Sequence, residues 1–152
     1  MPFTLGTRAG FRVTEAAPES SLYFRLDVKK AEEKDPLIRI SFRKNNLSPD
    51  KPQENDVYLV QDLDAGFWME QSKEPERKAL IKRDEKSNIS WYEYIKTGPA
   101  PGSGEPGDFY AVTYLRMEKG KPRVNFQMQI PLAKRADYEK KFYELSESFR
   151  WK

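Results

Sequence analysis

The most informative pattern in this chain is a change of hydrophobic period near its C-terminus. From Val124 to Ile130 apolar and polar residues alternate, which is typical of a strand with one buried face. After Pro131, four apolar residues recur at helical spacing: Tyr138, Phe142, Leu145 and Phe149. This stripe predicts an amphipathic helix over about Ala133–Phe149. The helix is expected to cover one face of a sheet, because the chain offers no other apolar surface against which to bury the stripe.

Alternation elsewhere predicts two hairpins and several shorter strands. Leu22–Val28 and Ile38–Phe42 are expected to pair antiparallel across the charged connection Lys29–Asp35. Asp108–Glu118 and Arg123–Ile130 form the stronger predicted hairpin. The polar positions of its second strand are expected to face solvent: Asn125, Gln127 and Gln129. Further strands are expected at Phe3–Leu5, Phe11–Val13, Val57–Val60, Gly66–Glu70 and Ile89–Lys96.

Three segments lack a clear alternating pattern. Asn45–Asp56 holds two prolines and few apolar residues, and Gly98–Gly107 holds four glycines and three prolines, so both are interpreted as loops. Glu74–Leu80 leaves two alternatives open. It fits a helical turn with Pro75 at its first position, or the connection into a strand over Ala79–Arg83.

These elements predict a single α+β domain over residues 1–152, with a mostly antiparallel sheet covered by the C-terminal helix. A chain of this length buries about two thirds of its unfolded surface, so it can fold without a covalent staple.

The composition narrows the possible chemistry. The chain contains neither cysteine nor histidine. Disulfides, thiolate metal sites and catalytic triads that use histidine are therefore excluded, and the usual general base at neutral pH is missing. We expect no cofactor and no enzymatic activity.

The charge and hydropathy indicate neither a nucleic-acid binder nor a membrane protein. The net charge is only +3, and the basic residues do not form the clustered excess typical of nucleic-acid binding. No apolar run approaches the roughly 20 residues of a membrane-spanning helix. Met1–Gly10 has no apolar signal-peptide core. Two localisations stay open: a periplasmic or otherwise exported protein whose signal has been removed, or a cytoplasmic one.

The first hairpin carries a candidate binding surface. Basic side chains are expected to share its solvent-facing side, with Tyr23 beside them: Arg25, Lys29, Arg39 and Arg43. A row of arginines can bind carboxylates, phosphates or an acidic partner protein. The alternative is an ordinary solvated sheet face balanced by Asp27.

Aromatic residues make up 13% of the chain, more than one sheet face can bury. They include Trp68, Trp91, Tyr92, Tyr94, Tyr110 and Tyr114. Trp91 and Tyr92 are adjacent in a predicted strand, so one of them points away from the core unless both faces are covered. We expect some of these rings, Trp91 and Tyr92 first, to line a groove or a partner surface.

An acidic cluster is the candidate cation site: Asp62, Asp64 and Glu70. Carboxylates two residues apart beside a glycine can hold calcium or magnesium. The match to a calcium loop is partial, because the third loop carboxylate is absent and Gly66 falls one position early. The alternative is a polar turn.

The two ends of the chain resemble the PsbP-like superfamily, which includes DcrB-type lipoproteins and the Ran-release factor. The resemblance rests on Gly10-Phe11 followed by Pro18, and on a strand, a proline and a helix that closes with Leu145-Ser-Glu-Ser148-Phe149. It covers about the first 20 and the last 45 residues. It implies an α/β/α sandwich, usually without catalysis, that acts in assembly or docking and often outside the cytoplasm.

Three functional hypotheses follow. The first is a non-enzymatic binding or assembly module that docks a protein partner. The second is an immunity or inhibitor protein that blocks a toxin or an enzyme. The third is a carboxylate-dependent hydrolase or calcium-binding domain built on the acidic cluster.

Overall fold

The computed structural model describes residues 3–6, 10–15, 25–31, 38–43, 77–99 and 107–152. These residues form two antiparallel sheets and one C-terminal helix, so the predicted α+β class with a mostly antiparallel sheet is confirmed. Among the described residues, no helix has the length and apolar character needed to cross a bilayer.

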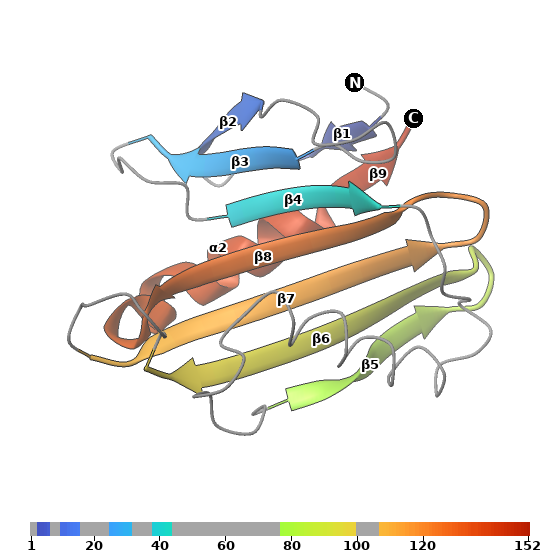
Figure 1. The fold of residues 1–152 in the computed structure, drawn as a ribbon. Helices are drawn as coiled ribbons and strands as arrows, with labels where there is room; N and C mark the ends of the chain where they lie inside the picture. Colours follow the sequence, from blue (N-terminus) through green and yellow to red (C-terminus); the bar gives the residue numbers. More distant parts are fainter. Residues whose placement is uncertain (1–2, 7–9, 16–24, 32–37, 44–76, 100–106) are drawn as a thin grey trace.

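Seven strands form the main sheet in the order β2-β3-β4-β8-β7-β6-β5 (Figure 1). Their bounds are β2 Phe11–Glu15, β3 Arg25–Lys30, β4 Ile38–Arg43, β5 Arg77–Asp84, β6 Ile89–Gly98, β7 Phe109–Glu118 and β8 Arg123–Pro131. Antiparallel pairing of β4 with β8 joins an N-terminal group of three strands to a C-terminal group of four. This long-range pairing makes one continuous sheet from two halves of the chain.

Both predicted hairpins are confirmed. Leu26 of β3 lies opposite Ile40 of β4, and Tyr114 of β7 lies opposite Phe126 of β8. Between residues 77 and 84 the chain is a strand, which decides the open alternative in favour of β5. The predicted strands Val57–Val60 and Gly66–Glu70 lie outside the described residues.

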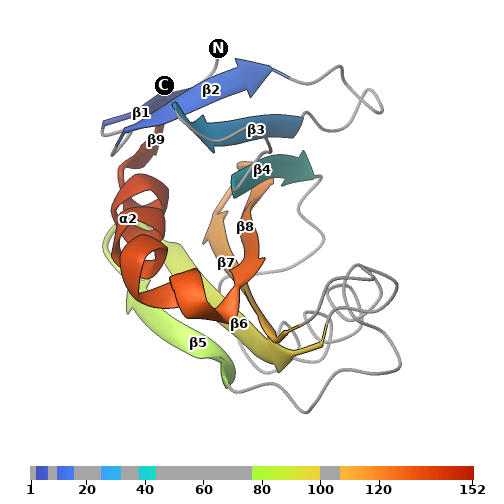
Figure 2. The ribbon, with the colours of Figure 1, turned by 90° about the vertical axis from the view of Figure 1, so that its left-hand side faces the viewer.

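Helix α2 (Arg135–Glu147) follows a 3₁₀ turn, η1 (Leu132–Lys134), and packs against one face of the curved main sheet (Figure 2). Its buried residues include three of the four predicted stripe positions: Tyr138, Phe142 and Leu145. The packing explains the stripe, since these side chains join the main core with apolar residues of β3, β4, β7 and β8.

The predicted helix boundary at Phe149 is wrong. The helix ends at Glu147, and Phe149 begins strand β9 (Phe149–Trp151), which pairs with β1 (Phe3–Leu5) in a second, two-stranded sheet. The Ser148 hydroxyl donates to the Leu145 carbonyl at 2.6 Å, and the Gly6 amide donates to the Ser148 carbonyl at 3.2 Å. Pairing with β1 thus replaces a further helical turn.

Both faces of the central strands are buried. Trp91 joins the core under α2, while Tyr92 belongs to a second cluster on the opposite face, with Tyr94, Leu115 and Met117. The adjacent aromatic pair therefore points into two different cores. Asn125, predicted to face solvent, is only 2% exposed for the same reason, whereas Gln129 is exposed as expected.

Candidate functional site

A pocket of about 590 Å³ lies at the C-terminal end of α2. Side chains from β5, β6, β7, β9 and the last turn of the helix line it. The sheet curvature and the short β9 strand bring these distant parts of the chain together, because β9 leaves the helix beside the paired ends of β6 and β7 (Figure 2).

Arg116 is the central side chain of this pocket. It lies on β7 opposite Trp91 of β6 and is 3% exposed. Its guanidinium lies 5.4 Å from the ring centroid of Trp91 and 5.3 Å from that of Phe149. Its Nη2 atom is 3.1 Å from Oε2 of Glu118. The charge is therefore held between two aromatic rings and one carboxylate.

The hydrogen-bonding capacity of Arg116 is incompletely used. Its Nε and Nη1 atoms are buried and meet no acceptor within the described part of the chain. Although Oε2 of Glu118 is at ion-pair distance, it accepts no hydrogen bond from the described groups either. A buried donor without an acceptor costs on the order of 1–3 kcal/mol, so an acceptor that entered here would recover stability.

Burial lowers the pKa of the Arg116 guanidinium; the Glu118 carboxylate opposes this change and the neighbouring charge of Arg150 adds to it. An arginine nevertheless stays protonated at physiological pH. Arg116 is thus a buried permanent cation.

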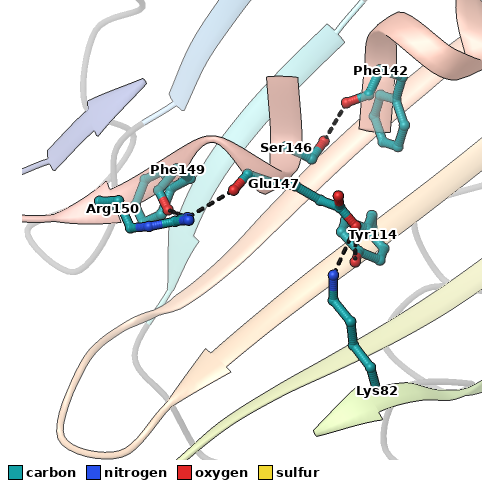
Figure 3. Close-up of polar contacts among 7 residues, drawn as sticks. All are labelled: Lys82, Tyr114, Phe142, Ser146, Glu147, Phe149 and Arg150. Carbon is teal, nitrogen blue, oxygen red and sulfur yellow. Dashed lines mark hydrogen bonds and ion pairs between the residues drawn. The ribbon is translucent and has the colours of Figure 1, made fainter. Parts of the chain in front are cut away.

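Glu147 links the end of the helix to the sheet (Figure 3). Its Oε1 atom accepts a hydrogen bond from Lys82 Nζ at 2.8 Å and another from the Tyr114 hydroxyl at 3.2 Å. Burial raises the pKa of Tyr114, and Glu147 raises it further, so this hydroxyl keeps its proton and acts as a donor. The two bonds fix one wall of the pocket.

A β-bulge brings Lys82 to this wall. Leu80 pairs with Tyr92 and Lys82 pairs with Trp91, so Ile81 is the extra residue. In regular pairing Lys82 would share the face of Leu80, because residues two apart point the same way. The extra residue reverses this and places Lys82 Nζ 5.0 Å from the Trp91 ring centroid.

Strand β9 supplies Arg150 and Trp151. Nη1 of Arg150 donates to the backbone carbonyls of Glu147 and Phe149 at 2.7 and 2.6 Å (Figure 3). The indole Nε1 of Trp151 is buried and has no acceptor among the described residues. Trp151, which lines the pocket, therefore has a donor atom that its described neighbours leave unused.

The arrangement is suited to holding an anionic group against an aromatic wall. Its charged lining is four cations and three carboxylates: Lys82, Arg83, Arg116 and Arg150, with Asp84, Glu118 and Glu147. Hydrogen bonds from the side chain and the backbone of Ser87 lower the pKa of Asp84, so its carboxylate is charged at neutral pH. In the described ranges no three acidic residues lie close enough together to hold a metal ion.

The predicted arginine row is described only in part. Arg39 is exposed on the sheet face away from α2 and forms an ion pair of 3.5 Å with Asp27. For Arg25 and Arg43 the structure gives the backbone pairing alone, with Ser41 and Arg123 respectively. Tyr23 and the acidic cluster of Asp62, Asp64 and Glu70 lie outside the described residues.

The two aromatic candidates lie on β6, separated from the arginine-bearing strand β4 by β8 and β7. Trp91 lines the pocket and stacks on Tyr114 with ring centroids 5.1 Å apart. Tyr92 is 1% exposed in the core of the opposite face. Of the two rings, only Trp91 therefore lines the pocket, and it does not lie beside Arg39.

Sequence reasoning missed Arg116, although one signal was present. Tyr110, Val112, Tyr114 and Arg116 occupy alternate positions of β7 and share the face that α2 covers. A charge that continues an apolar period marks a buried ion. No comparable signal exists in the sequence for Lys82 or Trp151. A β-bulge brings Lys82 to the pocket, and the unpredicted strand β9 brings Trp151 there.

Comparison with models of known protein families finds no match, and a search of curated proteins finds no relative that matches. The resemblance to the PsbP-like superfamily therefore stays a prediction from the sequence.

Proposed function

We propose that this domain is a non-enzymatic binding module that docks a partner protein, and that the pocket at the end of α2 receives an anionic group of that partner. One observation carries the proposal: Arg116 is a 3% exposed cation in a pocket, with two donor nitrogen atoms that meet no acceptor among the described residues. An incoming anion would supply both acceptor and counter-charge.

The residue types around Arg116 favour a protein as the partner. Tryptophan and arginine are the side chains most enriched where binding energy concentrates in protein interfaces. Here Trp91 and Arg116 form the buried centre, and the exposed side chains of Lys82 and Arg150 lie towards solvent. A desolvated centre within a charged rim is the usual anatomy of a specific interface.

The non-enzymatic part of the proposal rests on composition. Without histidine and cysteine, the chain lacks the most common general base and the most reactive nucleophile. We also propose that the protein acts in the periplasm or is otherwise exported, with the cytoplasm as the alternative. Absence of cysteine suits both. The native start of the gene distinguishes them, because an exported form would begin with a signal sequence.

Site-specific photocrosslinking in the native host tests the docking site. A photoreactive amino acid replaces Ser87, which is exposed and lines the pocket, and in a second variant replaces Thr14, which is exposed on β2. We expect the Ser87 variant, and not the Thr14 variant, to capture one protein. Introducing Arg116→Gln should abolish that adduct.

A second pair of variants decides between the two candidate surfaces. Arg39→Gln removes one charge from the arginine row, and Arg116→Gln removes one from the pocket. If Arg39→Gln abolishes binding of the captured partner while Arg116→Gln leaves it intact, the arginine row of the first hairpin is the docking surface and the proposal for the pocket is wrong.

A further inference from the structure

We infer that the pocket recognises a single carboxylate carried beside an aromatic side chain, as at the C-terminal residue of a peptide that ends in phenylalanine. This inference rests on the proposed function and specifies the group that the partner inserts.

The charge balance of the pocket favours one negative charge. Its four cations exceed its three carboxylates by one. Three of the cations already form hydrogen bonds: Lys82 donates to Glu147, Arg83 to Ser90 and Asn88, and Arg150 to two backbone carbonyls. A carboxylate would neutralise the excess. A phosphate dianion would instead leave the pocket with a net negative charge.

The unused donors match a carboxylate in number. Nε and Nη1 of Arg116 and Nε1 of Trp151 are three buried nitrogen atoms, which together carry four N–H bonds and meet no acceptors in the described part of the chain. Both side chains line the pocket and contact the ring of Phe149, Arg116 at 5.3 Å and Trp151 at 5.1 Å from its centroid. Two carboxylate oxygens provide about four acceptor sites, whereas a carboxamide provides one oxygen.

Binding such a ligand requires the guanidinium to reorient, because its Nε and Nη1 atoms are buried. Its ion pair with Glu118 is 3.1 Å long, yet Oε2 of Glu118 accepts no hydrogen bond from a described donor. No aligned bond therefore has to break when Nε and Nη1 of Arg116 reorient towards an incoming oxygen. Charge-assisted bonds of this kind are about twice as strong as neutral ones.

The apolar lining favours an aromatic group next to the carboxylate. Ile89 and the two tryptophans, Trp91 and Trp151, line the same pocket as Arg116. A volume of about 590 Å³ lies within the range of sites that hold small ligands. The C-terminal residue of a chain carries its carboxylate and its side chain on one carbon atom, so both can enter together.

Titrations with defined probes test the inference on the full chain. The probes are N-acetyl-glycyl-glycyl-phenylalanine with a free C-terminus, the same peptide as its C-terminal amide, 3-phenylpropionate and phenyl phosphate. Nitrogen–proton NMR spectra report binding through the indole signal of Trp151 and the Nε signal of Arg116. We expect the free peptide to shift both signals and to bind at least tenfold more tightly than its amide.

Variants tie the binding to the proposed donors. Arg116→Gln should abolish binding, and Trp151→Phe should weaken it severalfold while it retains an aromatic ring. Arg12→Gln, which removes an exposed charge from β2, should bind like the parent chain. Dispersed NMR spectra show whether each variant is folded, and Trp151→Phe keeps the test decisive if Arg116→Gln does not fold.

Several outcomes would overturn the inference. If the free peptide and its amide bind equally, the carboxylate is not recognised. If phenyl phosphate binds more tightly than the free peptide, the ligand is a phosphate, and if 3-phenylpropionate binds as tightly as the free peptide, the ligand is a small free acid.

The proposed function can fail independently of this inference. If photocrosslinking at Ser87 depends on Arg116 while no carboxylate probe binds, the docking site stands and this ligand class is wrong. If the carboxylate probes bind while photocrosslinking at Ser87 captures no protein, the ligand class stands and the proposed docking function is wrong.

Discussion

Phe149 lies where the end of the helix, the main sheet and the two-stranded sheet meet. It is fully buried, stacks on Phe3 at 5.1 Å and meets Phe126 edge to face at 5.7 Å between ring centroids. The same ring supports Arg116 and Trp151 of the pocket. One side chain thus couples the core to the candidate site.

Replacing Phe149 with alanine should lower the free energy of unfolding by about 3–5 kcal/mol, because the surrounding rings cannot fill the cavity. Urea denaturation measures the loss. Phe109→Ala is the matched control, since Phe109 is only partly buried and should lose clearly less. Equal losses in the free energy of unfolding for the two variants would mean that Phe149 contributes no more to the core than a partly buried phenylalanine does.

Buried tyrosines should make the protein sensitive to alkali. Burial raises the pKa of Tyr110, Tyr114 and Tyr143 above the usual value near 10, and Glu147 raises that of Tyr114 further. The unfolded chain therefore releases these protons at a lower pH than the folded chain does. The contribution of these tyrosines to the free energy of unfolding is fully present below about pH 10, and it is lost as the pH rises towards their pKa values in the folded state.

Absorbance titration of tyrosinate measures this behaviour. We expect these three residues to stay protonated in the folded chain at pH 11 and to ionise only with unfolding. Tyr114→Phe should reduce the slope of stability against pH above 10 by up to one proton. If all tyrosines titrate near 10 in the folded protein, the burial of these hydroxyls is contradicted.

At the scale of elements, the pairing of β1 with β9 decides where the helix ends and where Arg150 and Trp151 lie. The Gly6 amide donates to the Ser148 carbonyl at the start of this pairing. A Cβ atom added at Gly6 would lie 3.6 Å from Ser148, an ordinary contact. The amide hydrogen, and not the absence of a side chain, is what this position contributes.

Gly6→Pro should therefore destabilise the protein by about 1 kcal/mol or more, because proline has no amide hydrogen to donate. Gly6→Ala is the matched control and should be close to neutral. Thermal unfolding compares the two. Gly6→Pro should also alter the NMR signal of the Trp151 indole, since β9 loses a restraint; an unchanged signal would show that β1 does not position the pocket.

At the scale of the whole molecule, stability should be greatest where strands are paired on both sides and buried on both faces. Strands β6 and β7 meet both conditions, and β8 is paired on both sides. Strands β2 and β5 lie at the two ends of the seven-stranded order. The central strands should therefore open only with global unfolding.

Native-state hydrogen exchange tests this gradient. We expect the slowest amides in β6, β7 and β8, and exchange at least tenfold faster in β2 and β5. A uniform rate across the sheet would indicate that the molecule opens as one unit and that the edge strands are as strongly held as the centre.

Elements with a strong local period could be predicted, and long-range arrangements could not. The alternation in Val124–Ile130 and the stripe from Tyr138 to Leu145 located β8 and α2, because each reflects one face of one element. Pairing of β4 with β8 carries no such signal. This pairing depends on which edges of the two hairpins meet, and the sequence would allow several other strands to pair with β8.

For the pocket, the sequence identified Trp91 as a candidate but offered no reason to join it to Lys82, Arg116 or Trp151. A single extra residue at Ile81 turns Lys82 to the other face, and such a bulge leaves the composition of the strand unchanged. Trp151 reaches the pocket only because the chain leaves the helix to pair with β1.

By itself, therefore, the sequence determined the class of the fold, its main hairpins and the buried stripe of the helix, because these depend on side chains that are neighbours along the chain. The tertiary structure alone decided that both sheet faces are buried, that Phe149 leaves the helix, and that Arg116 lies in a pocket with unused donors. The physical reason is that burial and hydrogen-bond partners come from elements far apart in sequence, whose meeting no local period records.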